Sequence, residues 1–554
     1  MLEYGFMPPL MFAGLIVFLL FGFPVAFSLA ACGLTFGLLG ILTGHFEAVF
    51  LQALPLRFYG TLSNDLLLAI PFFTFMGAIL ERCGLAEDLL EGAGKLFGKV
   101  PGGLAFAVVL VGAILGAITG TVAASVIAMG VVSLPIMLRY GYNVRLATGV
   151  IAASGTITQL IPPSLVLIIL ADQLGRSVGD MYAGAIGPSM LQVAIFLTYI
   201  AGLAVLKPQL MPPLPPETRA EGTWRLLWKV AKGIVPSLAL MFLVLGTIFL
   251  GLATPTEAGA MGAVGAMLLA AMHGRLTWPL VRQGMETTTR ITAMVIFILI
   301  GSTIFSLVFQ GMDGGHWVKH LLSGLPGGVI GFLIFVNIFI FVLAFFLDFF
   351  EIAFIVIPML VPAAEALGID LVWFGVLICI NMQTSFMHPP FGFALFYLRG
   401  IAPKSVKTTD IYMGAIPWLA IQLIMVAVVI FWPGLVTHWL TKEKIVDPTT
   451  IQLNVPMPGA GQQGAPSFSA PPAPSFGSPP PPSFGAPSTA PAPQPMPAPS
   501  FGAPAPSAQP LPAPSFGAPA PSQPAPAPSF TAPAPSSQPL PPPSFGSPAP
   551  ATQE

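Results

Sequence analysis

The stretches ASGTITQLIPPS (153–164) and NMQTSFMHPP (381–390) decide the fold, because each interrupts an apolar segment with polar residues and a Pro-Pro pair. Proline removes a backbone donor and clashes with the preceding turn, so two in succession predict an unwound helix. Broken backbone at membrane depth is tolerated where it lines a cavity. One Pro-Pro pair is typical of a mere kink, whereas two at matching places indicate the central site of a secondary transporter.

A second pair of features precedes the two Pro-Pro pairs. The apolar stretches 103–138 and 326–366 are longer than the ~20 residues that a helix needs to cross a bilayer. Each has polar or small residues at its middle, Thr119 to Thr121 in one and Asp348 to Glu351 in the other, about 40 residues before its Pro-Pro pair. We expect two re-entrant hairpins and inverted repeats, the first over about 65–206 and the second over about 291–436.

Composition sets the class of protein. Of 554 residues, 55% are hydrophobic and only 8% are charged, which excludes a soluble enzyme and indicates an all-α polytopic protein in a lipid bilayer. With 21 Lys and Arg against 22 Asp and Glu, no basic field exists for binding nucleic acid. Three isolated cysteines predict neither disulfides nor a zinc site, and no cofactor is expected. The expected membrane segments are 9–42 (two passes broken near Gly22 and Pro24), 65–81, 103–138, 146–171, 181–206, 233–252, 256–272, 291–310, 326–366, 371–398 and 411–436.

The loop charges predict an orientation, because cytoplasmic loops collect Lys and Arg. If both long stretches are hairpins, the basic loops fall on one face. These loops carry Arg139 and Arg145, Lys207 to Lys232, Arg275 to Arg290, and Arg399 to Lys407. Both termini are then expected on the other, outer face.

A membrane domain at 1–446 is expected to give way to a tail at 447–554. The tail after Asp447 has 35 of the 61 prolines and repeats Pro-Ser-Phe seven times. Such a composition cannot bury enough apolar area to fold, so we expect it to be disordered. The regularly spaced Phe residues are either contacts for a partner or a low-complexity extension without one.

The candidate binding residues are the polar and helix-breaking residues of both hairpins and both breaks. In the first repeat they are Thr119, Gly120, Thr121, Ser125, Ser154, Gly155, Thr156, Gln159, Pro162, Pro163 and Ser164. In the second they are Asp348, Glu351, Asn381, Gln383, Thr384, Ser385, His388, Pro389 and Pro390. Asp348 is either a functional carboxylate or a helix cap, and His388 is either a neutral structural residue or a group for proton coupling.

The sequence resembles the large permease subunit of tripartite ATP-independent periplasmic (TRAP) transporters. The matching segments are Pro71-Phe72-Phe73 with Gly77, Gly116 to Thr121, Ala153 to Thr156 with Ile161 to Ser164, Pro255 to Ala258, Leu367 to Asp370 and Pro389 to Gly392. The resemblance implies an elevator-type transporter in the bacterial inner membrane, not an enzyme. The tail is expected in the periplasm, because the loop charges place both termini on the outer face. It also implies a small membrane subunit and an extracytoplasmic solute-binding protein as partners, and a small organic acid as substrate.

The resemblance further implies Na⁺ as the coupling ion, which we expect near Thr121 and Ser154 and near Asp348 and Thr384. The family's first hairpin commonly reads Ser-Gly-Ser-Ser, whereas this chain has Thr119-Gly120-Thr121-Val122 and one hydroxyl fewer. Where the family has Thr before Pro-Pro, this chain has His388. The run Leu347 to Ile352 is similar to a branch that transports 2-oxo or 2-hydroxy acids.

Two rival functions remain open at this point. A stand-alone organic-anion symporter or antiporter of similar architecture would need no delivery protein. A membrane-embedded enzyme would need clustered acids or a catalytic His and Ser constellation, and the sequence offers no such cluster.

Overall fold

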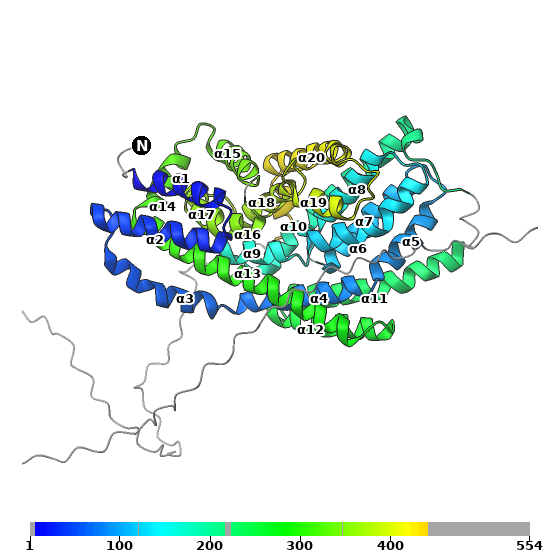
Figure 1. Cartoon of the computed structure of the whole chain (residues 1–554), viewed down its shortest axis with the longest axis horizontal. Helices are drawn as coiled ribbons and strands as arrows, with labels where there is room; N and C mark the ends of the chain where they lie inside the picture. The colour runs from blue at the N-terminus through cyan, green and yellow to red at the C-terminus, as the bar shows by residue number, and fades with distance from the viewer. Residues whose placement is uncertain (1–5, 120, 216–222, 346, 441–554) are drawn as a thin grey trace, which may run out of the picture. The chain divides into compact units, whose positions relative to one another are not determined.

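The computed structural model describes residues 6–119, 121–215, 223–345 and 347–440. Within these ranges all regular structure is helical (Figure 1), which confirms the expected all-α class. The predicted tail and Gly120 lie outside the described residues.

The chain begins with two helices joined at a glycine turn. Helix α1 (Met7–Leu20) and helix α2 (Val25–Thr43) are separated at Gly22, which has φ 77°, and at Pro24, which precedes α2. Both residues were expected to break this segment. The chain then passes through η1 (Ala48–Ala53), α3 (Leu54–Leu62) and η2 (Asp65–Leu68).

The order of elements recurs in the two halves of the chain. Each half has a first helix, a short amphipathic helix, two helices separated by a break, a helix interrupted at Pro-Pro, and a last long helix. The first half comprises α4 (Ala69–Arg82), α5 (Leu85–Phe97), α6 (Gly103–Thr119), α7 (Val122–Arg139), α8 (Val144–Thr156) with η3 (Ile157–Gln159), α9 (Leu165–Gln173), α10 (Val178–Leu206) and η4 (Pro208–Leu210). The second comprises α13 (Trp278–Gly311), α14 (Gly314–Ser323), α15 (Gly328–Leu343), α16 (Phe349–Glu351), the π-helix η6 (Ile352–Val356), α17 (Ile357–Ala366), α18 (Leu371–Ser385), α19 (Phe393–Ile401), α20 (Thr408–Phe431) and α21 (Gly434–Thr437). Pro162 follows the start of α8 by as many positions as Pro389 follows the start of α18, so the two breaks are equivalent.

Two helices connect the halves, α11 (Thr223–Phe249) and α12 (Pro255–Met272). Helix α12 begins with a capping box. The Thr254 backbone N–H donates to Glu257 Oε2 at 2.8 Å, and the Glu257 N–H donates to Thr254 Oγ1 at 3.3 Å. Glu257 therefore serves the start of its own helix.

Helix α13 differs from the expected segment 291–310, because it begins at Trp278. Thr277 caps this start by accepting a bond from the Leu280 N–H at 3.4 Å. Arg282 and Glu286 form an ion pair of 2.9 Å one turn apart, which supports a helix that apolar periodicity alone does not predict.

Six helical stretches of the described chain are long and apolar enough to cross a membrane, or seven if the bent pair 48–62 and 65–82 is one span. They include α7 and the continuous stretch Phe349–Ala366. Helix α6 ends at Thr119 and α15 ends at Leu343, so both long apolar stretches are interrupted near the predicted positions. The second limb of each is long enough to cross by itself, so the re-entrant course stays a prediction.

The broken helices pack against the opposite half of the chain. Helix α8 lies against α20, and α18 lies against α10. Each break is therefore enclosed by helices of both repeats.

Candidate functional site

The first break separates α8 from α9. Ser164 caps α9 by accepting a bond from the Val166 N–H at 3.2 Å, and its hydroxyl donates to the Gln159 carbonyl oxygen. The Pro162-Pro163 peptide is cis. Gly155, Thr156, Pro162 and Pro163 are buried, so this interruption lies inside the protein.

The second break separates α18 from α19, and its Pro389-Pro390 peptide is also cis. The Thr384 hydroxyl donates to the Asn381 carbonyl at 2.6 Å, and the Ser385 hydroxyl donates to the Met382 carbonyl at 2.5 Å. Both hydroxyls are therefore used within the last turn of α18. The expectation that they bind a ligand has to rest on their remaining lone pairs.

The tip of the second hairpin is a capping box. The Phe349 N–H donates to Asp348 Oδ1 at 2.6 Å, and the Asp348 N–H donates to Glu351 Oε2 at 3.0 Å. Of the two interpretations of Asp348, the cap is what the geometry shows. At the first tip, Thr121 precedes α7 in an extended conformation, and the Thr119 side chain is not among the described ones.

A cavity of about 230 Å³ lies where tips and breaks meet, and we call it the central cavity. It is lined by Thr121, Val122, Ala123, Gln159, Leu165, Val166, Ile291, Met294, Asp348, Phe349, Phe350, Phe386 and Tyr397. The structure thus brings together Thr121, Gln159 and Asp348, which the sequence predicted as site residues. Sequence reasoning missed Tyr397 of α19 and the α13 residues Ile291 and Met294. The polar Tyr397 in the half-helix after the second break was the available signal.

Other predicted residues hold the two repeats together. Gln192 Nε2 in α10 donates to Gln383 Oε1 at 2.7 Å, and Gln422 Nε2 in α20 donates to Thr156 Oγ1 at 2.8 Å. Gln192 and Gln422 lie equally far from the starts of their helices, as do Thr156 and Gln383. These two bonds are therefore equivalent contacts between the repeats, and neither glutamine partner was identified from sequence.

One further hydrogen bond joins each break to the hairpin of its own repeat. Thr158 Oγ1 lies 3.1 Å from Ser125 Oγ, and Asn381 Nδ2 donates to the Asn337 carbonyl at 2.8 Å. Ser125 and Asn381 are thus structural contacts as well as candidate ligands.

Several buried polar atoms near the breaks have no hydrogen-bond partner among the described residues. They are Ser154 Oγ, both amide atoms of Gln159, both ring nitrogens of His388, Asn337 Oδ1 and Gln422 Oε1. The His388 ring stacks on Phe345 with centroids 4.2 Å apart. Buried polar atoms without a partner cost free energy, so those at Ser154 and Gln159 fit an ion or water.

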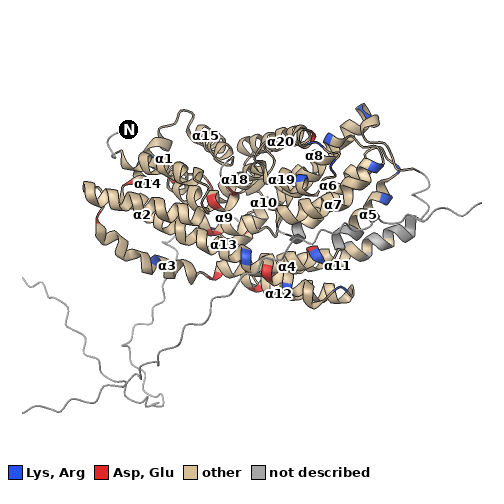
Figure 2. Cartoon of the chain, in the orientation of Figure 1, with Lys and Arg blue, Asp and Glu red and all other residues tan. Residues whose placement is uncertain are grey.

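The central cavity has an acidic side chain, that of Asp348, and no basic one among its described lining residues. Figure 2 shows the basic residues of the described chain dispersed over the helices, not gathered in one patch. In the described part of the chain no group of three or more His, Cys, Asp or Glu side chains could hold a metal ion.

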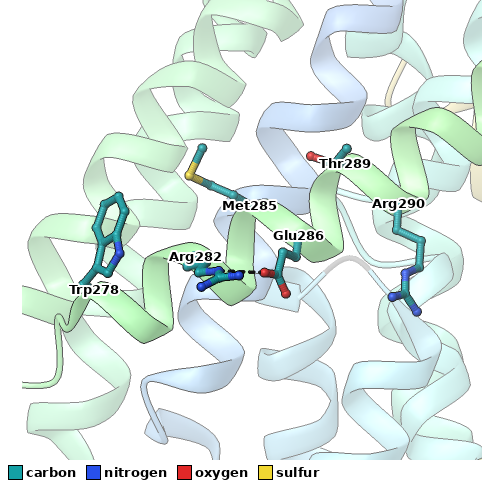
Figure 3. A pocket seen from close by; sticks show the side chains of 6 residues that line it. All are labelled: Trp278, Arg282, Met285, Glu286, Thr289 and Arg290. Carbon is teal, nitrogen blue, oxygen red and sulfur yellow. Dashed lines mark hydrogen bonds and ion pairs between the residues drawn. The ribbon is translucent and has the colours of Figure 1, made fainter. Parts of the chain in front are cut away.

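A larger hollow of about 630 Å³ lies along the first half of α13 (Figure 3). Its described lining is one face of that helix: Trp278, Arg282, Met285, Glu286, Thr289 and Arg290. No residue of either break or tip lines it among those described, so it is separate from the central cavity.

The chain is similar to known proteins over nearly all of the described residues. A family model described as the tripartite ATP-independent periplasmic transporter, DctM component, matches residues 12–435. The C4-dicarboxylate TRAP transporter large permease protein of Rhodobacter capsulatus is 30% identical over 448 residues, which are 77% of this chain and 97% of that protein. The sialic acid TRAP transporter large permease protein of Vibrio cholerae is 27% identical over 415 residues, which are 74% and 93% of the two chains.

A solved structure has a similar fold. The YdaH transporter of Alcanivorax borkumensis aligns with a TM-score of 0.52 at 15% identity, covering 71% of this chain and 91% of its own. At this identity the likeness concerns the fold alone.

Proposed function

The chain belongs to the DctM component family of tripartite ATP-independent periplasmic transporters, and we propose that it is the large membrane subunit of a sodium-coupled importer of a small organic acid. The observation that carries this proposal is the central cavity, where both tips and both breaks meet. Transporters built from internal repeats bind their substrate at such a junction.

The cavity's size and lining favour a small acid. Its volume of about 230 Å³ is below the ~300–1,000 Å³ typical of sites for drug-sized ligands. Gln159 and Tyr397 offer amide and hydroxyl groups, and α9 begins at the wall of the cavity with its backbone N–H groups. These are the donors that we assign to the substrate carboxylate.

Sodium supplies the missing positive charge in this proposal. A hard cation prefers oxygen ligands. Ser154 Oγ and Gln159 Oε1 are buried oxygens without a described partner, and carbonyls of the first break lie in the same segment. A cation there would offset the charge of Asp348 and of the substrate.

Membership of the family supports a proposal for the mechanism and the partners. We propose that hairpins and broken helices move as an elevator against the other helices, with the basic loops facing the bacterial cytoplasm and both termini the periplasm. The partners are a small membrane subunit and an extracytoplasmic solute-binding protein that delivers the acid.

Transport in proteoliposomes tests the proposal. The permease is reconstituted with the small subunit, and uptake of radiolabelled succinate, lactate and pyruvate is measured with the solute-binding protein under an inward sodium gradient. We expect at least one acid to accumulate only with the gradient and the binding protein. Accumulation by the permease alone would instead indicate a stand-alone symporter or antiporter, and accumulation that follows pH without sodium would contradict sodium coupling.

A further inference from the structure

A second polar cavity of about 410 Å³ lies apart from the central one, and we call it the outer cavity. It is formed by α3, η2, the end of α9, the second half of α13 and the π-helix and α17 of the second hairpin. Its described lining is Arg57, Gly60, Thr61, Asn64, Leu67, Asp172, Gln173, Leu299, Ser302, Thr303, Ser306, Phe354 and Pro358.

Three elements contribute residues to both cavities. In each element, the residues that line the outer cavity come later in the sequence than those that line the central cavity. Helix α9 contributes Leu165 and Val166 to the central cavity but Asp172 and Gln173 to the outer one. Helix α13 and the second limb of the second hairpin contribute in the same way. At 1.5 Å per helical residue, the two cavities lie on the order of 10 Å apart along these elements.

The outer cavity is at the end of α13 far from Arg282 and Arg290. Under the orientation proposed from the basic loops, this end faces the periplasm. A substrate released by a periplasmic protein would therefore meet the outer cavity first.

The charges of the outer cavity suit an anion better than those of the central cavity. Among the described lining residues Arg57 is the one cation, and it is exposed. Its Nη1 lies 3.4 Å from the Gln310 amide oxygen, and it forms no ion pair within the described chain. Its positive charge is therefore not neutralised by a described carboxylate.

The acid in this cavity is already bonded. Asn64 Nδ2 donates to Asp172 Oδ1 at 2.7 Å, and Gln173 Nε2 donates to Asp172 Oδ2 at 2.8 Å. Each carboxylate oxygen thus has an amide donor, and the described bond of Arg57 goes to the Gln310 amide oxygen and not to Asp172. The cavity also has a hydroxyl at Ser306 that can donate to an anion.

We propose that the outer cavity is an entry site that binds a substrate carboxylate through Arg57 before the substrate reaches the central cavity. The guanidinium is suited to this role, because it binds a carboxylate through two parallel N–H donors. This inference rests on the proposed function, since it assumes an organic acid arriving from the outer face.

Cysteine labelling tests binding without requiring transport. The native cysteines Cys32, Cys83 and Cys379 are fully buried, which gives a low background. Thr61→Cys places a thiol in the cavity, and Ser63→Cys places one on the exposed surface two residues away as the matched control. Both are labelled with the anionic ethylsulfonate and the cationic ethyltrimethylammonium thiosulfonate reagents, with acetate, lactate or succinate as competitor.

We expect at least one of the three acids to slow anionic labelling of Thr61→Cys by about tenfold at saturation and to leave Ser63→Cys unchanged. Adding Arg57→Gln should abolish the protection and the preference for the anionic reagent, and Arg57→Lys should retain part of both. If none of the acids slows the labelling of Thr61→Cys more than that of Ser63→Cys, the proposal is overturned. Protection by the ligand-free solute-binding protein but by none of the acids would assign Arg57 to protein docking and would overturn it as well.

Transport kinetics separate this inference from the proposed function. Arg57→Gln should raise the KM for the transported acid about tenfold and leave kcat within about twofold. If the wild-type complex transports no acid, the proposed function fails. If the wild type transports but Arg57→Gln has an unchanged KM and no protection is seen, the entry site alone is wrong.

Discussion

At the first break, Ser154 Oγ and the Gln159 amide have no described partner, whereas at the second break Asn381, Thr384 and Ser385 all bond to backbone carbonyls. The breaks occupy equivalent places in the two repeats, so this difference does not come from their position. It indicates that the first break keeps oxygens available for an ion, whereas the buried atoms without a described partner at the second break are the ring nitrogens of His388.

The largest effect is expected where the broken helices contact the opposite repeat. A Cβ on Gly149 in α8 would overlap the backbone carbonyl of Gly414 in α20, whereas one on Gly184 in α10 would lie 2.9 Å from the Val436 side chain, which can move. Gly149→Ala should cost about 3 kcal/mol of stability and Gly184→Ala about 1 kcal/mol. Thermal unfolding of the purified permease in detergent measures both, and equal losses would show that the two contacts do not differ.

The glutamine bonds between the repeats should give the next largest effect. Gln192→Leu leaves the buried Gln383 amide without a partner, which costs about 2 kcal/mol. Gln422→Leu should cost less than about 1 kcal/mol, because the Thr156 hydroxyl still donates to the Ala153 carbonyl.

Thermal unfolding of the double variant Gln192→Leu/Gln383→Leu is the control for this pair. It should recover part of the loss, because both polar groups are then removed. If the double variant loses more stability than the two single variants lose together, the assigned bond is contradicted.

Ion binding should depend on the first break more than on the second. Ser154→Ala and Thr121→Ala should each raise the sodium concentration for half-maximal transport about tenfold without loss of stability. Asn381→Ala removes a bond to the Asn337 carbonyl, so it should cost about 1 kcal/mol of stability and change the sodium dependence less. Sodium titration of uptake in proteoliposomes distinguishes these variants, and equal sodium effects at all three positions would refute the placement of the ion.

The smallest effect is expected at His388. Its ring packs against Phe345 and Phe341, with centroids 4.2 Å and 4.8 Å away, and no described residue bonds to its nitrogens. His388→Gln should lower uptake by no more than about tenfold through lost packing and should leave its pH dependence unchanged. A pH profile that changes in this variant would favour proton coupling.

The sequence predicted the features that depend on local chemistry. Pro162-Pro163 and Pro389-Pro390 interrupt helices wherever they stand, and Asp348 caps a helix through its own neighbours, so the positions of the breaks could be read from residue types. The side chains that pair across the repeats could not. Gln192 and Gln422 lie in ordinary apolar helices, and nothing near them in sequence indicates Gln383 or Thr156 as partners.

The early start of α13 and the role of Tyr397 were missed for a related reason. Residues 278–290 are too polar to be recognised as part of a membrane segment, and their helix depends on the Thr277 cap and the ion pair of Arg282 with Glu286. Tyr397 reaches the central cavity because α19 packs against α7 and α8 of the first repeat, which is a matter of tertiary packing.

The capping box at Asp348 gives this residue two separate roles at the wall of the central cavity: its side-chain oxygen starts a helix, and its carboxylate carries a negative charge. An amide oxygen can accept the Phe349 N–H as a carboxylate does, so Asp348→Asn would keep the helix start while deleting one negative charge. Under the proposed function, Asp348→Asn should therefore shift the substrate preference of the permease toward more highly charged acids while the tip keeps its structure.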